Sequence, residues 1–168
     1  MRGFILGVVL TLLAIGVGGY LFVRGGGVSL STTAAPLPME KTLAHMALRA
    51  SIGDAKDRKD PLSFDDSNMV AGAELYKQHC AVCHGAPGKQ PTAISKGMFP
   101  PPPRLFEKDD FVTDDPEGVT FWKVTHGIRL SGMPGFESTV SDTERWQITM
   151  LVSHADKLST PAQAAFGK

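Results

Sequence analysis

The sequence predicts an all-α protein in which one membrane-spanning helix precedes a helical domain. The first observation is an uncharged apolar run of 20 residues, Phe4 to Val23. The second is a series of helix start and stop signals beyond residue 60. The third is that no segment of useful length alternates polar and apolar residues as a half-buried strand would.

Composition excludes several classes of protein. The 168 residues contain 17 Lys and Arg against 17 Asp and Glu, whereas a nucleic-acid-binding protein normally has a basic surplus. With 42% hydrophobic and 20% charged residues, the chain is neither disordered nor a bundle of membrane helices. Only 2 cysteines are present, so a framework of several disulfides is impossible.

The apolar run at the N-terminus is long enough to be a membrane anchor. As a helix it spans about 30 Å, the thickness of the hydrocarbon core of a bilayer. A cleaved leader is the alternative, with Gly25 to Gly27 as a possible cleavage region, but its apolar part is usually only about 7–15 residues long. Arg2 and the terminal amine favour a cytoplasmic N-terminus, and Arg24 opposes it. We therefore expect a single pass through a bacterial-type inner membrane, with the following domain in the periplasm.

The remainder divides by composition. A stretch without charge and with little bulk follows the anchor and is typical of a flexible tether. A short helical extension comes next, because Leu43, Met46, Ala47 and Ala50 have helical spacing and Pro61 stops the pattern. The expected divisions are an anchor at 1–24, a tether at 25–38, an N-terminal extension at 39–65, a main domain at 66–160 and a C-terminal tail at 161–168.

Three helices are expected in the main domain. The first begins near Ser67 and runs into Cys80, and a loop rich in Gly and Pro follows it from Gly85 to Leu105. The second begins at Asp115-Pro116-Glu117, with Asp as N-cap and Pro at the first position, and ends at Gly127, a residue suited to the left-handed closing position.

The third helix opens with Ser141-Asp142-Thr143-Glu144, which has the pattern of a capping box. It is expected to run through Trp146 to about Leu158. The main domain is therefore predicted to be entirely helical.

The segment Cys80-Ala81-Val82-Cys83-His84 is the C-x-x-C-H motif of covalent haem c attachment. On a helix, the two thiols and the imidazole fall within about 100° of one face, so the thiols can bond the haem while the imidazole reaches the iron. A structural zinc site would need two more soft ligands, and no other cysteine exists. A redox dithiol would belong to a βαβ pattern, which is absent.

Two motifs together resemble class I, or monohaem, c-type cytochromes. Residues 71–76 with Cys80 to Gly85 are similar to the opening of that family, and Gly127 to Pro134 is similar to its distal-ligand loop. The resemblance covers about residues 67–158. It implies a cytochrome c-like helical fold that wraps one haem c and carries one electron at a time.

The expected sixth ligand of the haem iron is Met133. It lies between Gly132 and Pro134, and it is far enough from His84 in sequence to reach the opposite haem face. Met98 is one alternative, although it is expected on the side of His84. His126 is the second alternative, although its spacing with Val119 and Trp122 favours packing.

Further side chains receive candidate roles, and the role of Pro103 comes from the family resemblance. It implies that the Pro103 carbonyl accepts the imidazole N–H of His84, which would fix the orientation of the ring. Arg129 is a candidate partner for a haem propionate or, equally, an exposed arginine at a helix end. Trp146 is a candidate propionate donor, with core packing as the commoner role. His79 is expected to point away from the haem, at the surface.

An acidic run from Glu107 to Glu117 has two interpretations. It is a solvated loop with a charge bias toward the next helix, or it is a docking patch for a basic redox partner. Its acids are Glu107, Asp109, Asp110, Asp114, Asp115 and Glu117.

The function expected from these patterns is electron transfer, without enzyme activity, nucleic acid or small-molecule substrate. His84 and Met133 would hold the iron while the haem accepts and donates electrons with a redox donor and a redox acceptor protein. The chain is then a free carrier or the cytochrome subunit of a dehydrogenase or oxidase. The alternatives are a haem enzyme or gas sensor with an open sixth position, and a structural haem subunit.

Overall fold

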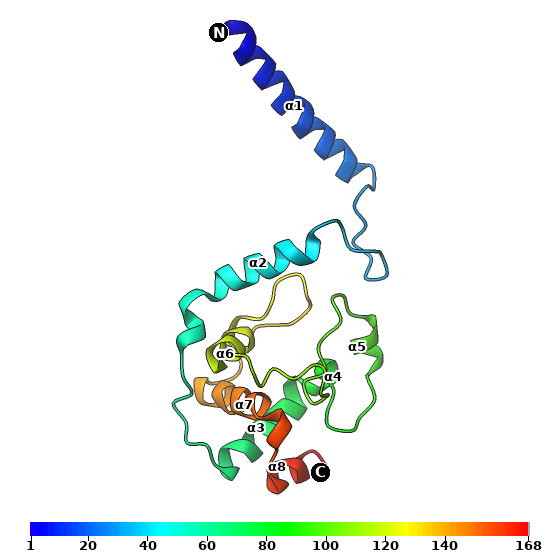
Figure 1. The fold of residues 1–168 in the computed structure, drawn as a ribbon. Coiled ribbons are helices and arrows are strands. Elements are labelled where there is room, and N and C mark those ends of the chain that lie inside the picture. The colour runs from blue at the N-terminus through cyan, green and yellow to red at the C-terminus, as the bar shows by residue number, and fades with distance from the viewer. Residues whose placement is uncertain (168) are drawn as a thin grey trace. The chain divides into compact units, whose positions relative to one another are not determined.

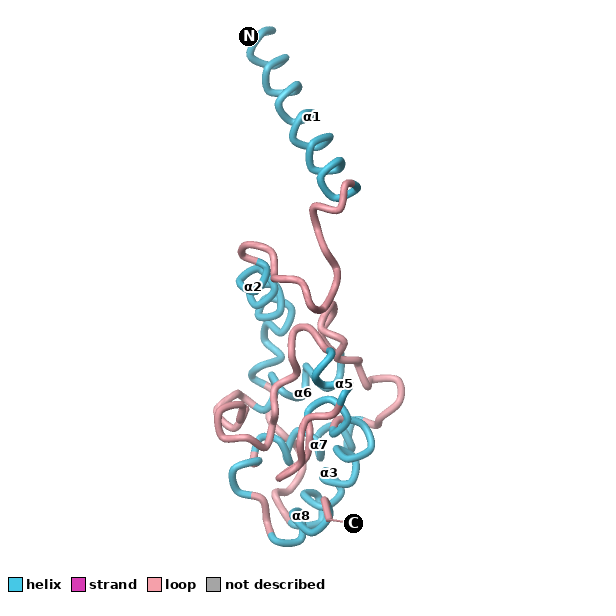
Figure 2. Tube along the Cα trace, turned by 90° about the vertical axis from the view of Figure 1, so that its right-hand side faces the viewer, coloured by secondary structure: helices cyan, strands magenta, loops and turns pink. Residues whose placement is uncertain are grey.

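The computed structural model describes residues 1–167 and divides the chain into two units, Met1–Lys41 and Thr42–Lys168. The described part is helical, as predicted, and contains no strand beyond an isolated bridge between Ile128 and Met133 (Figure 2). The elements are α1 (Arg2–Arg24), α2 (Glu40–Ile52), the 3₁₀ helix η1 (Gly53–Asp57), α3 (Asp66–His79), α4 (Ala81–His84), α5 (Ala93–Gly97), α6 (Glu117–His126), α7 (Asp142–Ser153), the 3₁₀ helix η2 (Ala155–Lys157) and α8 (Thr160–Ala165).

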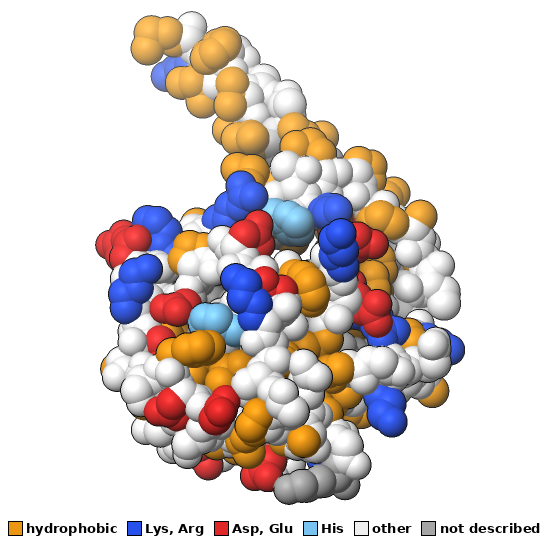
Figure 3. Space-filling view, turned by 60° about the horizontal axis from the view of Figure 1, so that its bottom comes forward, with side chains coloured by type: hydrophobic (Ala, Val, Ile, Leu, Met, Phe, Trp, Pro, Cys, Tyr) orange, Lys and Arg blue, Asp and Glu red, His pale blue; other side chains and the backbone are white. Residues whose placement is uncertain are grey.

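The first unit consists of α1 and the segment that follows it. Hydrophobic side chains cover α1, and none of its residues is buried within the protein (Figure 3). Among residues 1–167, α1 is the one helix long and apolar enough to cross a membrane, judged by length and composition. A signal sequence passes the same test.

The second unit is built around the crossing of α3 and α7, against which α8 also packs (Figure 1). Gly72 lies at this crossing, because a Cβ atom there would lie 2.2 Å from the backbone oxygen of Gln147. The absence of a side chain therefore lets the two helices approach closely. The buried core around the crossing contains Met69, Ala73, Tyr76, Met150, Leu151, Val152, Ala162 and Ala165.

Residues 42–65 of the expected N-terminal extension belong to this unit. The carbonyl groups of Ala55, Lys56 and Arg58 approach Gly118 so closely that a Cβ atom there would clash with them. The Arg58 guanidinium lies over the ring of Phe121, 4.5 Å from its centroid, and Phe121 in turn stacks on Trp146 at 3.9 Å. The segment thus covers one side of α6 and α7.

The predicted helix limits agree in part with the structure. The Ser141–Glu144 capping box is present, and Gly127 ends α6 with a φ of +67°. However, Pro116 and not Asp115 occupies the N-cap position of α6, and no side chain caps the helix there. The Asp115 carboxylate pairs with Lys123 at 3.1 Å.

The end of the chain differs from the prediction. Helix α7 ends at Ser153 and not near Leu158. The expected tail at 161–168 is helical as far as Ala165, and its Ala162 and Ala165 are buried in the core. The structure also forms the short helix α5 within the expected loop, where Thr92 caps it by accepting the Ser95 N–H.

Candidate functional site

The two cysteines and His84 lie in a tight turn where α3 meets α4. Cys80 separates the two helices, and its carbonyl accepts hydrogen bonds from the N–H groups of Cys83 (3.1 Å) and His84 (2.9 Å). Gly85 ends the turn with a φ of +76°, a value that favours glycine. The buried Tyr76 hydroxyl donates to the Gly85 carbonyl at 2.9 Å and so ties the turn to the core.

The imidazole of His84 is held by the proline-rich segment. Its Nδ1 lies 2.9 Å from the Pro103 carbonyl oxygen, which is the contact that the family resemblance implied. A carbonyl can only accept, so Nδ1 carries the proton and Nε2 keeps a free lone pair. Burial lowers the pKa of His84, and the hydrogen bond to Pro103 only partly offsets that shift. The ring is therefore neutral and suited to bind a metal through Nε2.

Met133 belongs to a closed loop that returns to α6. The N–H of Ile128 donates to the Met133 carbonyl at 3.1 Å, and the Ser131 hydroxyl donates to the Ile128 carbonyl at 2.7 Å. Beyond the loop, the Phe136 N–H donates to the Val124 carbonyl on α6 at 3.1 Å. These bonds fix the loop against the helix that precedes it.

The turn, the proline-rich segment and the Met133 loop surround one cleft. The cleft contains about 670 Å³ that protein atoms do not fill, part of it open to solvent. Most of the side chains that line it are apolar. They are His79, Cys80, Cys83, His84, Met98, Pro100, Pro101, Pro102, Pro103, Val124, Ile128, Ser131, Gly132, Met133, Pro134 and Phe136.

The donor set of the cleft fits haem c. Both cysteines are free, so both thiols are available for thioether bonds. Burial raises the pKa of Cys80 to about 12, which disfavours the thiolate that a zinc site or a redox dithiol needs. Within residues 1–167, no group of three or more His, Cys, Asp or Glu side chains is arranged to hold a metal ion. An apolar cleft with two thiols, one neutral imidazole and a thioether suits a metal that arrives within a macrocycle.

The comparison with known families agrees with this chemistry. Residues 67–150, half of the chain, match the family described as cytochrome c oxidase, cbb3-type, subunit III. The chain belongs to this family of c-type cytochromes. No curated protein matches the sequence. As a c-type cytochrome, the protein binds haem c covalently and transfers electrons with redox protein partners.

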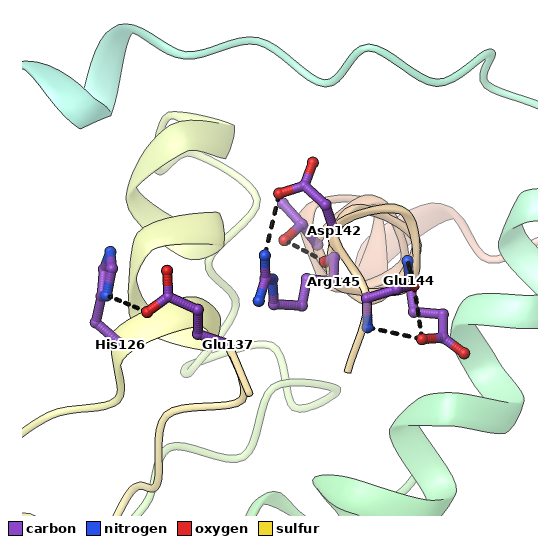
Figure 4. A network of polar contacts seen from close by, with 7 residues as sticks. His126, Glu137, Asp142, Glu144 and Arg145 are labelled. Atoms are coloured by element: carbon purple, nitrogen blue, oxygen red, sulfur yellow. Dashed lines mark hydrogen bonds and ion pairs between the residues drawn. The ribbon is translucent and has the colours of Figure 1, made fainter. Parts of the chain in front are cut away.

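The alternative ligands lie at different positions in this cytochrome. Met98 lines the same cleft as Met133, and a Cβ atom on Gly132 would lie 3.1 Å from the Met98 methyl group. His126 is exposed and does not line the cleft, and its Nδ1 lies 3.8 Å from the Glu137 carboxylate (Figure 4). The structure therefore favours Met98 over His126 as the alternative to Met133.

His79 does not lie where the sequence suggested. It is half-buried and lines the cleft, with its ring centroid 5.7 Å from that of Phe136. The expectation of a surface histidine pointing away from the cleft was wrong, because α3 ends at His79 and the chain turns there into Cys80.

Arg129 and Trp146 do not contribute to the cleft lining. Arg129 is exposed on the Met133 loop. Trp146 is 1% exposed and packs between α6 and α7 against Phe121. Its place in the core favours the packing role over that of a propionate donor.

The acidic run is largely occupied by contacts within the protein. The Glu107 carboxylate pairs with Arg104 at 3.0 Å, and Asp110 accepts the Arg104 backbone N–H at 2.9 Å. Asp115 pairs with Lys123, and Glu117 accepts the Asp60 N–H at 3.3 Å. These contacts favour a structural role for the run over a docking patch.

Sequence reasoning missed several residues that shape the site. Tyr76, which lies on α3, supports the turn that holds Cys80, Cys83 and His84. The Thr92 hydroxyl donates to the Val82 carbonyl at 2.6 Å and so joins that turn to α5. Phe136 and Ile128 line the cleft on either side of Met133. Only the apolar character of Phe136 and Ile128 beside Met133 signalled their role, and nothing local marked Tyr76 or Thr92.

Proposed function

We propose that the protein binds one haem c with His84 and Met133 as axial ligands and transfers single electrons between redox proteins. Helix α1 holds it in the inner membrane with its N-terminus in the cytoplasm and the haem domain in the periplasm. One observation carries the ligand assignment: an oriented, neutral His84 and Met133 come from separate segments and line the same apolar cleft as both cysteines.

Different side chains of the cleft have different roles in binding the haem. Cys80 and Cys83 attach it, and the Pro103 carbonyl fixes the ring of His84 so that Nε2 remains the donor to the iron. The hydrogen bonds of the 128–133 loop hold the Met133 thioether at the cleft without a large loss of freedom on binding. The haem iron then supplies a one-electron couple.

The apolar lining sets the working state of this couple. Val124, Ile128 and Phe136 contribute apolar lining to the cleft, and a low-polarity surrounding with a thioether ligand would favour the reduced state more than a pair of imidazoles would. If His84 and Met133 both bind the iron, they would leave it no position for a substrate. Electron transfer without chemistry on a substrate is therefore the function that this arrangement supports.

Family membership supports a role as the cytochrome subunit of a larger oxidase or dehydrogenase, with a free carrier as the alternative. Purification of the protein from membranes in mild detergent distinguishes these roles. A subunit retains its partner proteins in a stable complex, whereas a free carrier elutes alone.

Replacement of Met133 tests the ligand assignment. The unmodified protein is expected to be low-spin, to show the weak near-infrared sulfur-to-iron band in the ferric state, and to bind carbon monoxide poorly. Met133→Ala is expected to lose the band and to bind carbon monoxide. Met133→His is expected to stay low-spin with a lower potential, a measurable change because haem ligation spans about 0.8 V.

Met98→Ala is the matched control, because Met98 is a second methionine in the same cleft. It is expected to keep the sulfur-to-iron band. If Met98→Ala loses the band and Met133→Ala retains it, Met98 is the ligand. If the unmodified protein already binds carbon monoxide readily, a haem enzyme or gas sensor with an open sixth position replaces the proposal.

A further inference from the structure

Helix α2 has two apolar faces, and only one of them meets the rest of the domain. Leu48 and Ile52 line a groove whose other wall includes Val119 of α6, and Ile52 is 8% exposed. The opposite face is uncovered: Leu43 is 55% exposed and Met46 is 61% exposed. At about 100° per residue, the uncovered apolar residues lie within about 100° of one another around the helix. They are Leu43, Met46, Ala47 and Ala50.

Residues 40–59, which comprise α2 and the segment after it, differ in net charge from the remainder of the domain. Residues 40–59 contain five Lys or Arg against three Asp or Glu, whereas residues 60–167 contain nine against fourteen. The segment that begins with α2 is thus net basic, while the rest of the domain is net acidic. An anionic surface attracts the first and repels the second.

The length of the tether keeps α2 close to the bilayer. Fifteen residues separate the end of α1 at Arg24 from the start of α2 at Glu40. Fully extended, they reach about 50 Å, and as a flexible chain their mean span is about 20 Å. A weakly apolar helix held at that distance meets the lipid surface at a high effective concentration.

We propose that the uncovered face of α2 lies on the anionic phospholipid surface of the membrane, with Leu43 and Met46 inserted among the acyl chains. Arg49 lies beside this face on the helix and reaches the headgroups. This contact orients the haem domain on the membrane. The inference rests on the proposed role of α1 as an anchor.

Nitroxide labels on the full-length holoprotein test the contact. Single cysteines replace Leu12 in α1, Met46 in α2 and Lys157 in η2, and the protein is reconstituted in vesicles of equimolar phosphatidylcholine and phosphatidylglycerol. Cys80 and Cys83 are consumed by haem, so the holoprotein without an added cysteine takes up no label. A high collision rate of the nitroxide with oxygen indicates that the label lies in lipid. A high collision rate with a water-soluble nickel chelate indicates that the label lies in water.

The expected oxygen-to-nickel ratio at position 46 is severalfold higher than at position 157. Leu43→Glu is expected to lower the ratio at position 46 severalfold. His45→Glu, which places the same charge on the other side of α2, is expected to change the ratio little. Vesicles of phosphatidylcholine alone, or high salt, are expected to lower the ratio because the basic segment then loses its electrostatic attraction.

Two outcomes overturn the inference without affecting the anchor. In the first, position 12 is in lipid while position 46 is as accessible to water as position 157. In the second, coupling between nitroxides at position 46 shows that a second copy of the chain covers the face. If position 12 is itself in water, the anchor fails, and the membrane part of the proposed function fails with it.

Discussion

The local contacts and burial of His84, Tyr76 and Trp146 differ, and these differences set the role of each side chain. The Pro103 carbonyl fixes the proton of His84 on Nδ1, and burial raises the pKa of the Tyr76 hydroxyl, which donates to the Gly85 carbonyl. Trp146 is also buried, but it lies in the core and does not line the cleft. Stability and redox behaviour are therefore expected to depend on different residues.

Replacement of Trp146 is expected to change stability and leave the potential intact. Trp146→Ala removes the ring that stacks on Phe121 and is expected to lower the free energy of unfolding by about 3–5 kcal/mol. Trp146→Phe retains an aromatic ring and serves where the alanine variant does not fold. Unfolding in urea and the midpoint potential are measured for each variant that folds. A shifted potential with unchanged stability would instead support contact with a haem propionate.

Asp60 is expected to make stability depend on pH. Burial raises the pKa of its carboxyl group, and the neighbouring Glu117 carboxylate adds to that shift. A raised folded-state pKa contributes stability at pH below the unfolded value, and that contribution is lost as pH rises through the folded value. Asp60→Asn keeps an acceptor for the Leu62 N–H, which donates to Asp60 Oδ1 at 2.8 Å.

Asp60→Asn is therefore expected to stabilise the protein at neutral pH, and its advantage is expected to shrink in acid. Urea unfolding at a series of pH values measures the difference from the unmodified protein. Asp109→Asn, at an exposed position of the acidic run, is the control and is expected to change little. An Asp60→Asn effect that is equal at all pH values would contradict the role of the charge.

At the scale of secondary-structure elements, close approach between helices holds the domain together. Helix α3 carries the residues that lead into the attachment turn, and α7 crosses it at Gly72. Glycine at this position costs helix propensity, about 1 kcal/mol relative to alanine. The close crossing compensates for that cost by burying the facing side chains.

Gly72→Ala is expected to destabilise the protein by about 1–3 kcal/mol, although alanine is the better helix former. The added methyl group would lie 2.2 Å from the Gln147 backbone oxygen, so α3 and α7 must separate. Gly97→Ala at the end of α5 is the matched control, because no atom lies within 4 Å of its Cβ position. Urea unfolding compares the two variants. Equal stabilities of these variants would contradict the packing argument.

At the scale of the whole molecule, a membrane-length helix and a haem domain are joined by a short uncharged segment. If α1 spans the membrane as proposed, the lengths of the helix and the tether would limit the distance that the haem domain can move from the bilayer. If α1 remains in the mature protein, electron transfer is confined to partners at the membrane surface. Loss of α1 would convert the same domain into a diffusible carrier.

Removal of the N-terminal segment tests whether α1 is an anchor. The full chain is expected to remain in carbonate-washed membranes, whereas a chain beginning at Met39 is expected to be soluble and to keep its haem when exported. Immunoblotting of the fractions measures the distribution. N-terminal sequencing that finds a mature start near Val28 would identify α1 as a cleaved leader.

The sequence by itself determined the features that depend on neighbouring residues. Cys80, Cys83 and His84 predict the haem c that family membership implies, because covalent attachment requires their spacing. The Ser141–Glu144 capping box forms within a single turn. The length and apolarity of α1 are likewise properties of one continuous segment. Such signals are readable because the interacting groups are only a few residues apart.

Only the tertiary structure decided which distant segments meet. It placed His79 in the cleft lining and Trp146 in the core, and it buried α8 beyond the expected end of the domain. It also showed that most acids of the 107–117 run contact other groups of the same chain. These outcomes depend on close packing between elements far apart in the chain, and local sequence patterns do not encode which surfaces pack together.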